Sequence, residues 1–125
     1  MRSILSLALL VLAAAPAGAF TAENGLVVRA EPDGSFSVPW RGPGDASAFW
    51  CAAGDYAIRA LHAAPTARVW RITPVPRPAG AAMRFSMRPD GAAERTGLLL
   101  LGGKGAAISA GFAASFCDEQ RWRRP

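Results

Sequence analysis

Residues that bind metals are scarce in this 125-residue sequence, which contains one histidine, His62, and two cysteines, Cys51 and Cys117. A protein zinc site needs three or four ligands. If the two cysteines form a disulfide, histidine and thiolate cannot assemble such a site. Residues 102–105 also lack the G-x-x-x-x-G-K-[ST] spacing of a phosphate-binding loop. We therefore expect no metal and no cofactor.

The sequence also lacks a second long apolar run after its N-terminus, and the first one is short. Residues 4–15 are twelve apolar or small residues, too few for a bilayer span of about 20 residues. They follow Met1 and Arg2 and precede the small residues at 17–19, which is the pattern of a cleavable secretory signal peptide. We expect residues 1–19 to be removed by cleavage after Ala19. The product would be periplasmic or secreted, with no transmembrane segment.

Lysine is nearly absent, since Lys104 is the only lysine among 14 basic residues. Removal of Arg2 with the signal peptide leaves 13 basic residues against 9 acidic ones, a net charge of +4. Because arginine carries almost all of this excess, and alanine, glycine and proline are abundant, the excess is typical of the codon bias of a GC-rich genome and is weak evidence for a nucleic-acid partner. Export also argues against such a partner, so we expect no nucleic-acid binding.

Two cysteines in an exported chain usually pair, because oxidising compartments remove free thiols. We predict a disulfide between Cys51 and Cys117, which would close a long loop and stabilise the fold by roughly 4 kcal/mol. Asp55 and His62 share a helical face with Cys51 and could suggest a catalytic triad. Helical rise, however, separates Cys51 from His62 by about 16 Å, whereas a nucleophile and its base must approach within roughly 3 Å.

The mature chain begins with a pattern typical of a β-hairpin. Residues 26–31 place Leu26, Val28 and Ala30 on one face of a strand, and residues 36–41 have an apolar side chain at every second position. A Pro-Asp-Gly turn separates the two segments. Pro39 cannot donate a hydrogen bond to a neighbouring strand, so we expect the second strand at a sheet edge. Trp40 and the later Trp70 fall on apolar faces and are expected in the core.

A helix is predicted next, with Asp45 or Ser47 capping its first turn. Its apolar residues share one face at 100° per residue; they are Phe49, Trp50, Ala53, Tyr56, Ala57, Ala60 and Leu61. Gly54 lies inside this helix at a cost of up to about 1 kcal/mol relative to alanine. We attribute its presence to close packing against another element.

Further patterns complete an α+β domain over residues 20–117. Three more strands are predicted, over residues 68–73, 83–88 and 97–101. Ser109 can cap a final helix that carries Phe112 and Phe116 and reaches Cys117. The order ββαβββα predicts a small, mostly antiparallel sheet with two helices on one face, joined by the disulfide. Residues 118–125 are expected to form a polar, basic tail.

Residues 49–57 read Phe-Trp-Cys-Ala-Ala-Gly-Asp-Tyr-Ala, and Phe116 and Cys117 follow far downstream. Together these segments resemble an uncharacterised family of small exported proteins from alphaproteobacteria. The resemblance extends over most of the mature chain, and the nine-residue segment is its more specific part. It implies export and a shared fold, and no particular activity.

Two polar groups are candidate functional sites. Asp55 and Arg59 have the four-residue spacing of a helix-surface ion pair worth a few tenths of a kcal/mol, and we expect both to face water. Burial of Asp55 would instead indicate a polar site and argue against a non-catalytic function. At the C-terminus, Trp122 stands among arginines that could bind an acidic partner or an anionic membrane surface. These are Arg121, Arg123 and Arg124. A solvated terminus is the alternative.

The sequence therefore predicts an exported, small, soluble domain that acts as a non-catalytic binding module for an unknown envelope protein. One alternative is a small envelope hydrolase that uses a carboxylate such as Asp55, with Arg59 or Arg68 binding an anion. Another is a binder of an anionic ligand that uses the excess of arginine. A deep pocket with a strongly shifted carboxylate would favour the enzyme, and an exposed aromatic patch would favour the module.

Overall fold

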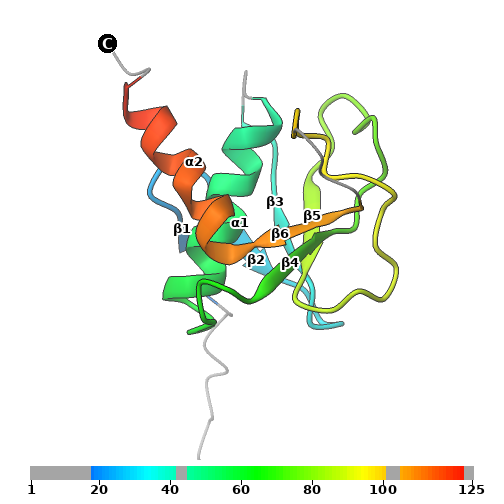
Figure 1. The fold of residues 1–125 in the computed structure, drawn as a ribbon, viewed down its shortest axis with the longest axis horizontal. Helices are drawn as coiled ribbons and strands as arrows, with labels where there is room; N and C mark the ends of the chain where they lie inside the picture. The colour runs from blue at the N-terminus through cyan, green and yellow to red at the C-terminus, as the bar shows by residue number, and fades with distance from the viewer. Residues whose placement is uncertain (1–17, 42–44, 101–104, 123–125) are drawn as a thin grey trace, which may run out of the picture.

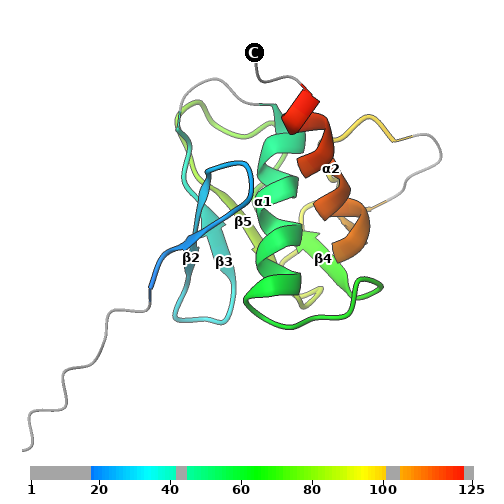
Figure 2. The same ribbon diagram turned by 90° about the vertical axis from the view of Figure 1, so that its left-hand side faces the viewer.

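The computed structural model describes residues 18–41, 45–100 and 105–122. In these residues the chain forms β1 (Phe20–Thr21), β2 (Val27–Ala30), β3 (Phe36–Val38), α1 (Ala46–Arg59), β4 (Arg68–Arg71), β5 (Met83–Ser86), β6 (Ala107–Ser109) and α2 (Ala110–Trp122). The two helices lie side by side on one face of the sheet (Figures 1 and 2). The predicted α+β fold is confirmed, with a short additional strand, β1, at its start.

The strands form an antiparallel sheet of order β1-β2-β3-β5-β4-β6. The predicted hairpin is present, since β2 pairs with β3, but β3 also pairs with β5 on its other side. The edge position predicted from Pro39 is therefore wrong. The strand ends at Val38, so Pro39 lies beyond the ladder and its missing N–H has no effect on pairing.

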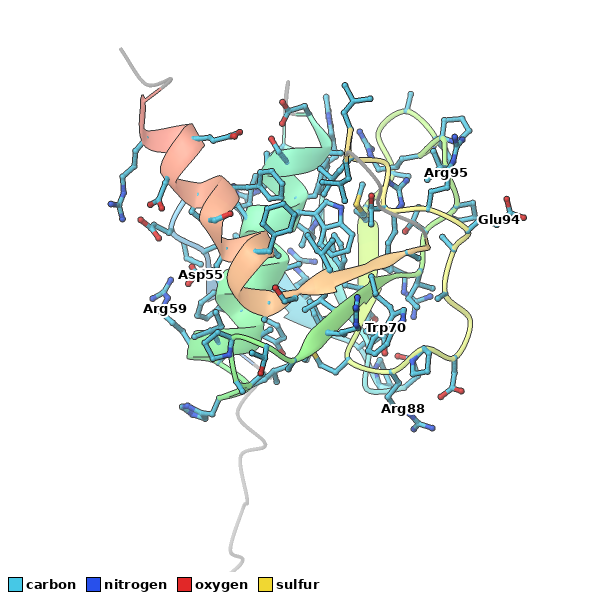
Figure 3. The ribbon with its side chains drawn as sticks, in the orientation of Figure 1. Asp55, Arg59, Trp70, Arg88, Glu94 and Arg95 are labelled. Atoms are coloured by element: carbon cyan, nitrogen blue, oxygen red, sulfur yellow. A yellow bond between two sulfur atoms is a disulfide. The ribbon has the colours of Figure 1, made fainter. Side chains whose placement is uncertain are left out.

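The predictions that Trp40 and Trp70 lie in the core are both wrong, Trp40 because of where its strand ends and Trp70 because of the direction in which it faces. Trp40 lies beyond the end of β3 and is 45 % exposed. In β4, Val69 and Arg71 face the helices and are buried, so Trp70 between them lies on the opposite face, where it is half-buried (Figure 3).

The predicted strand at 97–101 is also absent over its described residues, 97–100. Gly97 has a φ of +79°, which interrupts an extended conformation, and Leu99 points fully into solvent while Leu98 and Leu100 pack against the core. The strand beside β4 is instead β6, where Ile108 pairs with Val69.

The apolar face of α1 is buried against the sheet as predicted. Trp50 is fully buried, and its ring meets that of Phe85 edge-on at a centroid distance of 4.8 Å. Asp45 is the N-cap and accepts a hydrogen bond from the N–H of Ala48. Leu61 is exposed, contrary to the periodic pattern, because the helix ends at Arg59 and the chain then turns away.

The two helices are joined closely in two ways. Cys51 of α1 and Cys117 of α2 form the predicted disulfide, with a Cα–Cα distance of 4.9 Å. A Cβ atom added to Gly54 would lie 2.7 Å from the Cβ of Ala113, which confirms that glycine permits close packing here. Beyond Cys117, α2 continues to Trp122, so residues 118–122 are helical and not part of an irregular tail.

The predicted signal peptide lies largely outside the described residues, which begin at Gly18. At the predicted cleavage site, Gly18 and Ala19 are exposed and irregular. Neither α1, with 14 residues, nor α2, with 13, has the length and apolarity of a membrane-spanning helix, and the same holds for the rest of the described chain.

Candidate functional site

Asp55 is buried, with only 6 % of its surface exposed, so the prediction that it faces water is wrong. The cause is the segment that follows β1, which folds beside α1 (Figure 2). There the N–H of Glu23 donates a hydrogen bond of 2.8 Å to Oδ2 of Asp55. The side-chain amide of Asn24 donates to the carbonyl of Ala48 and holds the same segment in place.

Arg59 occupies the other side of this carboxylate (Figure 3). Its Nε donates to Oδ1 and its Nη2 to Oδ2 of Asp55, and its guanidinium lies 4.8 Å from the ring centroid of Phe20. The hydrogen bond to Asp55 raises the pKa of Arg59. The predicted ion pair is thus present, with Arg59 exposed and Asp55 covered.

The polar site that the burial of Asp55 indicates is structural. Both carboxylate oxygens bind groups of the chain itself, and Asp55 lines none of the four cavities that we describe. A catalytic carboxylate must reach a substrate atom in a pocket. Asp55 and Arg59 instead fasten the N-terminal segment to α1.

The C-terminal arginines are only partly described. Arg121 forms ion pairs with Glu23 and with Asp118, the latter at 3.9 Å, so its guanidinium group is paired with carboxylates of the same chain. The backbone of Trp122 is helical, and Arg123 and Arg124 lie outside the described residues. A partner contact through this segment therefore stays a prediction.

A polar cavity of about 400 Å³ lies beside strand residues that face away from the helices. Its charged lining residues pair with one another: Arg84 with Asp33 and Arg88 with Asp90, each at 2.9 Å. Hydrogen bonds from Ser35, with a smaller contribution from Arg84, lower the pKa of Asp33. A lowered pKa keeps this carboxyl group ionised, whereas a general acid needs a raised one.

Two exposed apolar side chains, Leu99 and Phe112, lie near two half-buried ones, Leu98 and Phe116, on α2 and residues 98–99. We call this set, Leu98, Leu99, Phe112 and Phe116, the apolar patch. Phe112 is 45 % exposed, and its ring lies 5.3 Å from that of Phe116. A cavity of about 390 Å³ is lined by Leu98, Leu99 and Phe116, and its charged lining residues, Asp45 and Glu119, are both acidic.

Arg71 is a buried cation that our sequence analysis missed, although its spacing from Val69 could have indicated it. It is 2 % exposed, and its guanidinium donates to the carbonyls of Thr73 (2.6 Å), Pro74 (2.9 Å) and Thr96 (3.0 Å). Burial, and then the positive charges of Arg77 and Arg95, lower the pKa of Arg71. Within the described residues, none of these three arginines forms an ion pair with a carboxylate.

A cavity of about 220 Å³ lies beside this guanidinium and is lined by Arg71, Arg77, Phe49, Val75 and Met83, among others. We call it the arginine cavity. The guanidinium of Arg77 lies 4.8 Å from the ring centroid of Phe49. A neighbouring hollow of about 400 Å³ shares Val75 and is lined by Arg95 and Glu94. Figure 3 shows the side chain of Glu94 extending outward into solvent.

Among the described residues, no group of three or more histidine, cysteine or acidic side chains could hold a metal ion. No protein-family model matches the chain, and searches of curated proteins and of solved structures give no match either. The resemblance to exported alphaproteobacterial proteins therefore stays a prediction, and function has to be argued from the geometry.

Proposed function

We propose that this protein is a non-catalytic binding module that acts outside the cytoplasm and holds a partner protein on the apolar patch. The observation that carries the proposal is the exposure of this patch. Leu99 is fully exposed and Phe112 nearly half-exposed, beside a cavity that Leu98 and Phe116 help to line. Contiguous exposed apolar surface with polar surroundings typically marks an interaction site.

The charges around the patch define the chemistry of the partner. The chain as a whole carries a formal net charge of +5, yet the charged side chains that line the cavity, Asp45 and Glu119, are both acidic. Complementary charge favours the correct partner and disfavours others. The partner segment therefore presents apolar side chains flanked by lysine or arginine, with an aromatic or aliphatic anchor entering the cavity between α2 and residues 97–99.

The proposed compartment is supported by two features. The disulfide between Cys51 and Cys117 is of the kind that persists in oxidising compartments and is rare in the cytosol of mesophiles. The first 19 residues have the signal-peptide pattern, and intact-mass measurement of the exported product is expected to show a chain that starts at Phe20. A product that retains residues 4–15 would contradict export with cleavage.

The hydrolase alternative gains no support from its proposed carboxylate. Asp55 is buried, and its two oxygens accept hydrogen bonds from Glu23 and Arg59. Arg68, suggested as an anion-binding group beside it, lies on β4 and donates to the carbonyl of Ala107. The anion-binding alternative is favoured by a separate observation, the arginine cavity, which is argued below.

Site-directed photo-crosslinking tests the proposal. A photo-reactive residue placed at position 99 or 112 should crosslink an envelope protein. The same residue at position 61, just beyond the end of α1, should not, although Leu61 is 43 % exposed and Phe112 45 %. The purified partner should then bind wild-type protein, and Leu99→Ser with Phe112→Ser should weaken that binding at least tenfold, while Leu61→Ser leaves it unchanged. Equal crosslinking at 61 and 112, the two positions of similar exposure, would overturn the proposal. If the only crosslinked product is a dimer of this protein, the patch mediates self-association and the proposed partner is wrong.

A further inference from the structure

The arginine cavity has the features of a ligand site that the partner-binding function does not use. We propose that it binds a small organic anion, a carboxylate or phosphate group attached to a short apolar body. Three features of the cavity support this site: a buried positive charge without an ionic partner, a second cation on the cavity wall, and an otherwise apolar lining of suitable size.

The first observation is the state of Arg71. A buried ion is costly unless it is paired and hydrogen-bonded. Its three hydrogen bonds to backbone carbonyls use three of the five N–H groups of a guanidinium. Carbonyl dipoles supply no net negative charge, so an anion in the cavity would complete the neutralisation of Arg71.

The second observation is the convergence of positive charge. Arg77 lies on the wall of the same cavity, with its guanidinium held over Phe49 and its Nη1 donating to the carbonyl of Ala81. The chain thus fixes a second cation next to the first, against their mutual repulsion. Such an arrangement is stabilised when an oxyanion accepts hydrogen bonds from guanidinium groups, since charge-assisted bonds of this kind are among the strongest in proteins.

The N-terminus of α1 also lies at this cavity. Ala46, the first residue of the helix, lines the cavity. Helix N-termini carry a partial positive charge that attracts anions. Asp45 caps the same end, and its negative charge offsets this partial positive charge, so the helix terminus is not among the three features that support the site; Asp45 itself does not line this cavity.

The third observation sets the size and polarity of the ligand. Phe49, Val75 and Met83 make the rest of the wall apolar, so the body attached to the anionic group is apolar. The volume of about 220 Å³ is below the roughly 300–1,000 Å³ of pockets for drug-sized ligands. A ligand with one small ring or a short alkyl chain fits this description.

The arginine cavity adjoins the cavity beside the apolar patch, but different side chains define the two sites. The two cavities share Ala46 and Gly97 in their linings, but no patch residue lines the arginine cavity and neither Arg71 nor Arg77 lines the other. Loss of partner binding would therefore leave this inference intact, and the reverse also holds.

Titration of the mature protein at constant ionic strength tests the inference. The probes are phenyl phosphate, benzoate and inorganic phosphate, with chloride as the control, and binding is followed by NMR of backbone amides and by calorimetry. We expect saturable binding of phenyl phosphate or benzoate, with the largest shifts at Phe49, Arg77 and Met83, which line the arginine cavity and not the cavity beside the apolar patch. Whichever probe binds more tightly identifies the anionic group as phosphate or carboxylate. Absence of saturation for both probes, or shifts spread over all surface arginines, would overturn the proposal.

Variants test the named residues. Arg77→Gln should weaken binding about tenfold or more, as expected for losing a charge-assisted hydrogen bond, and Arg77→Lys should weaken it less. Arg29→Gln is the matched control, because Arg29 is an exposed arginine on β2 away from the cavity lining. Equal weakening in both glutamine variants would mean unspecific charge attraction and would refute the site. If Arg77→Gln does not fold, the amide shifts of the wild-type protein still decide the question.

Discussion

Trp50 of α1 and Arg71 of β4 donate hydrogen bonds to the same backbone oxygen, the carbonyl of Thr96, at 3.1 Å and 3.0 Å. This oxygen lies directly before Gly97, which lines the arginine cavity, and Leu98, which belongs to the apolar patch. One acceptor therefore positions the segment that contributes to both proposed sites. The core tryptophan and the buried arginine are coupled through it.

Replacing Trp50 tests this anchor. Trp50→Ala should lower the free energy of unfolding by about 3–5 kcal/mol, the usual loss for a large buried aromatic side chain. Trp50→Phe should cost less, because it keeps ring contacts with Phe85 and loses mainly one hydrogen bond worth about 1 kcal/mol. Urea denaturation followed by circular dichroism measures both. A loss below about 1 kcal/mol for Trp50→Ala would show that the ring is not a core element.

Local patterns predicted the hairpin and the first helix because their determinants are close in sequence. The Pro-Asp-Gly turn joins β2 to β3, and the 3.6-residue period placed Trp50 and Tyr56 in the core correctly. The strand at 97–101 was predicted from a run of leucines, yet the partner of β4 is β6. Gly97 instead adopts a positive φ and packs against the guanidinium of Arg71, 26 positions away, a contact that the local sequence pattern does not contain.

The disulfide offers a second prediction. The Cys51→Ala and Cys117→Ala double variant should be destabilised by about 2–5 kcal/mol, because the bridge restricts the unfolded chain and joins residues 66 positions apart. Thiol titration of the native wild-type protein should find no reactive cysteine, and a reductant should lower its unfolding midpoint toward that of the double variant. Titration of two free thiols before unfolding would contradict the bridge.

Asp55 gives a third prediction, now opposite to the one for a surface pair. Asp55→Ala should lower the free energy of unfolding by about 1–3 kcal/mol, because the N–H of Glu23 loses its acceptor and Arg59 its partner. Asp118→Ala is the control: among the described residues this exposed aspartate of α2 forms one ion pair, at 3.9 Å with Arg121, and its loss should stay within about 0.5 kcal/mol. Equal losses in thermal or chemical denaturation would mean that Asp55 has no structural role.

The burial of Asp55 could not be deduced from its helix. On the helical wheel it lies opposite the apolar face, and the segment at Glu23, 32 positions earlier in the sequence, packs beside it and hydrogen-bonds its carboxylate. Arg71 is different, since its spacing from the buried Val69 already places it on the inner face of β4. The sequence pattern does not indicate that a cation can be buried at this position. The carbonyls of Thr73, Pro74 and Thr96, which accept hydrogen bonds from its guanidinium, come together only in the folded chain.

The contact at Gly54 leads to the fourth prediction. Helix propensity alone would make Gly54→Ala stabilising by up to about 1 kcal/mol. An added Cβ, however, would lie 2.7 Å from the carbonyl oxygen of Ala110 and from the Cβ of Ala113, so α2 would have to move. We expect a net loss of about 1–3 kcal/mol in the free energy of unfolding, as for other overpacked cores. Ser115→Ala, at an exposed position of α2, should change it by less than about 0.5 kcal/mol.

The disulfide makes this last prediction sharper, because Cys51 precedes Gly54 by three residues and fixes α2 through Cys117. If steric overlap causes the loss, α2 can shift more freely once the bridge is removed. The cost of Gly54→Ala should then be smaller in the Cys51→Ala, Cys117→Ala background than in the wild type, which a double-mutant cycle measures as a coupling energy. A stabilising Gly54→Ala, or an identical cost in both backgrounds, would show that the helices are not held in contact by the bridge at this glycine.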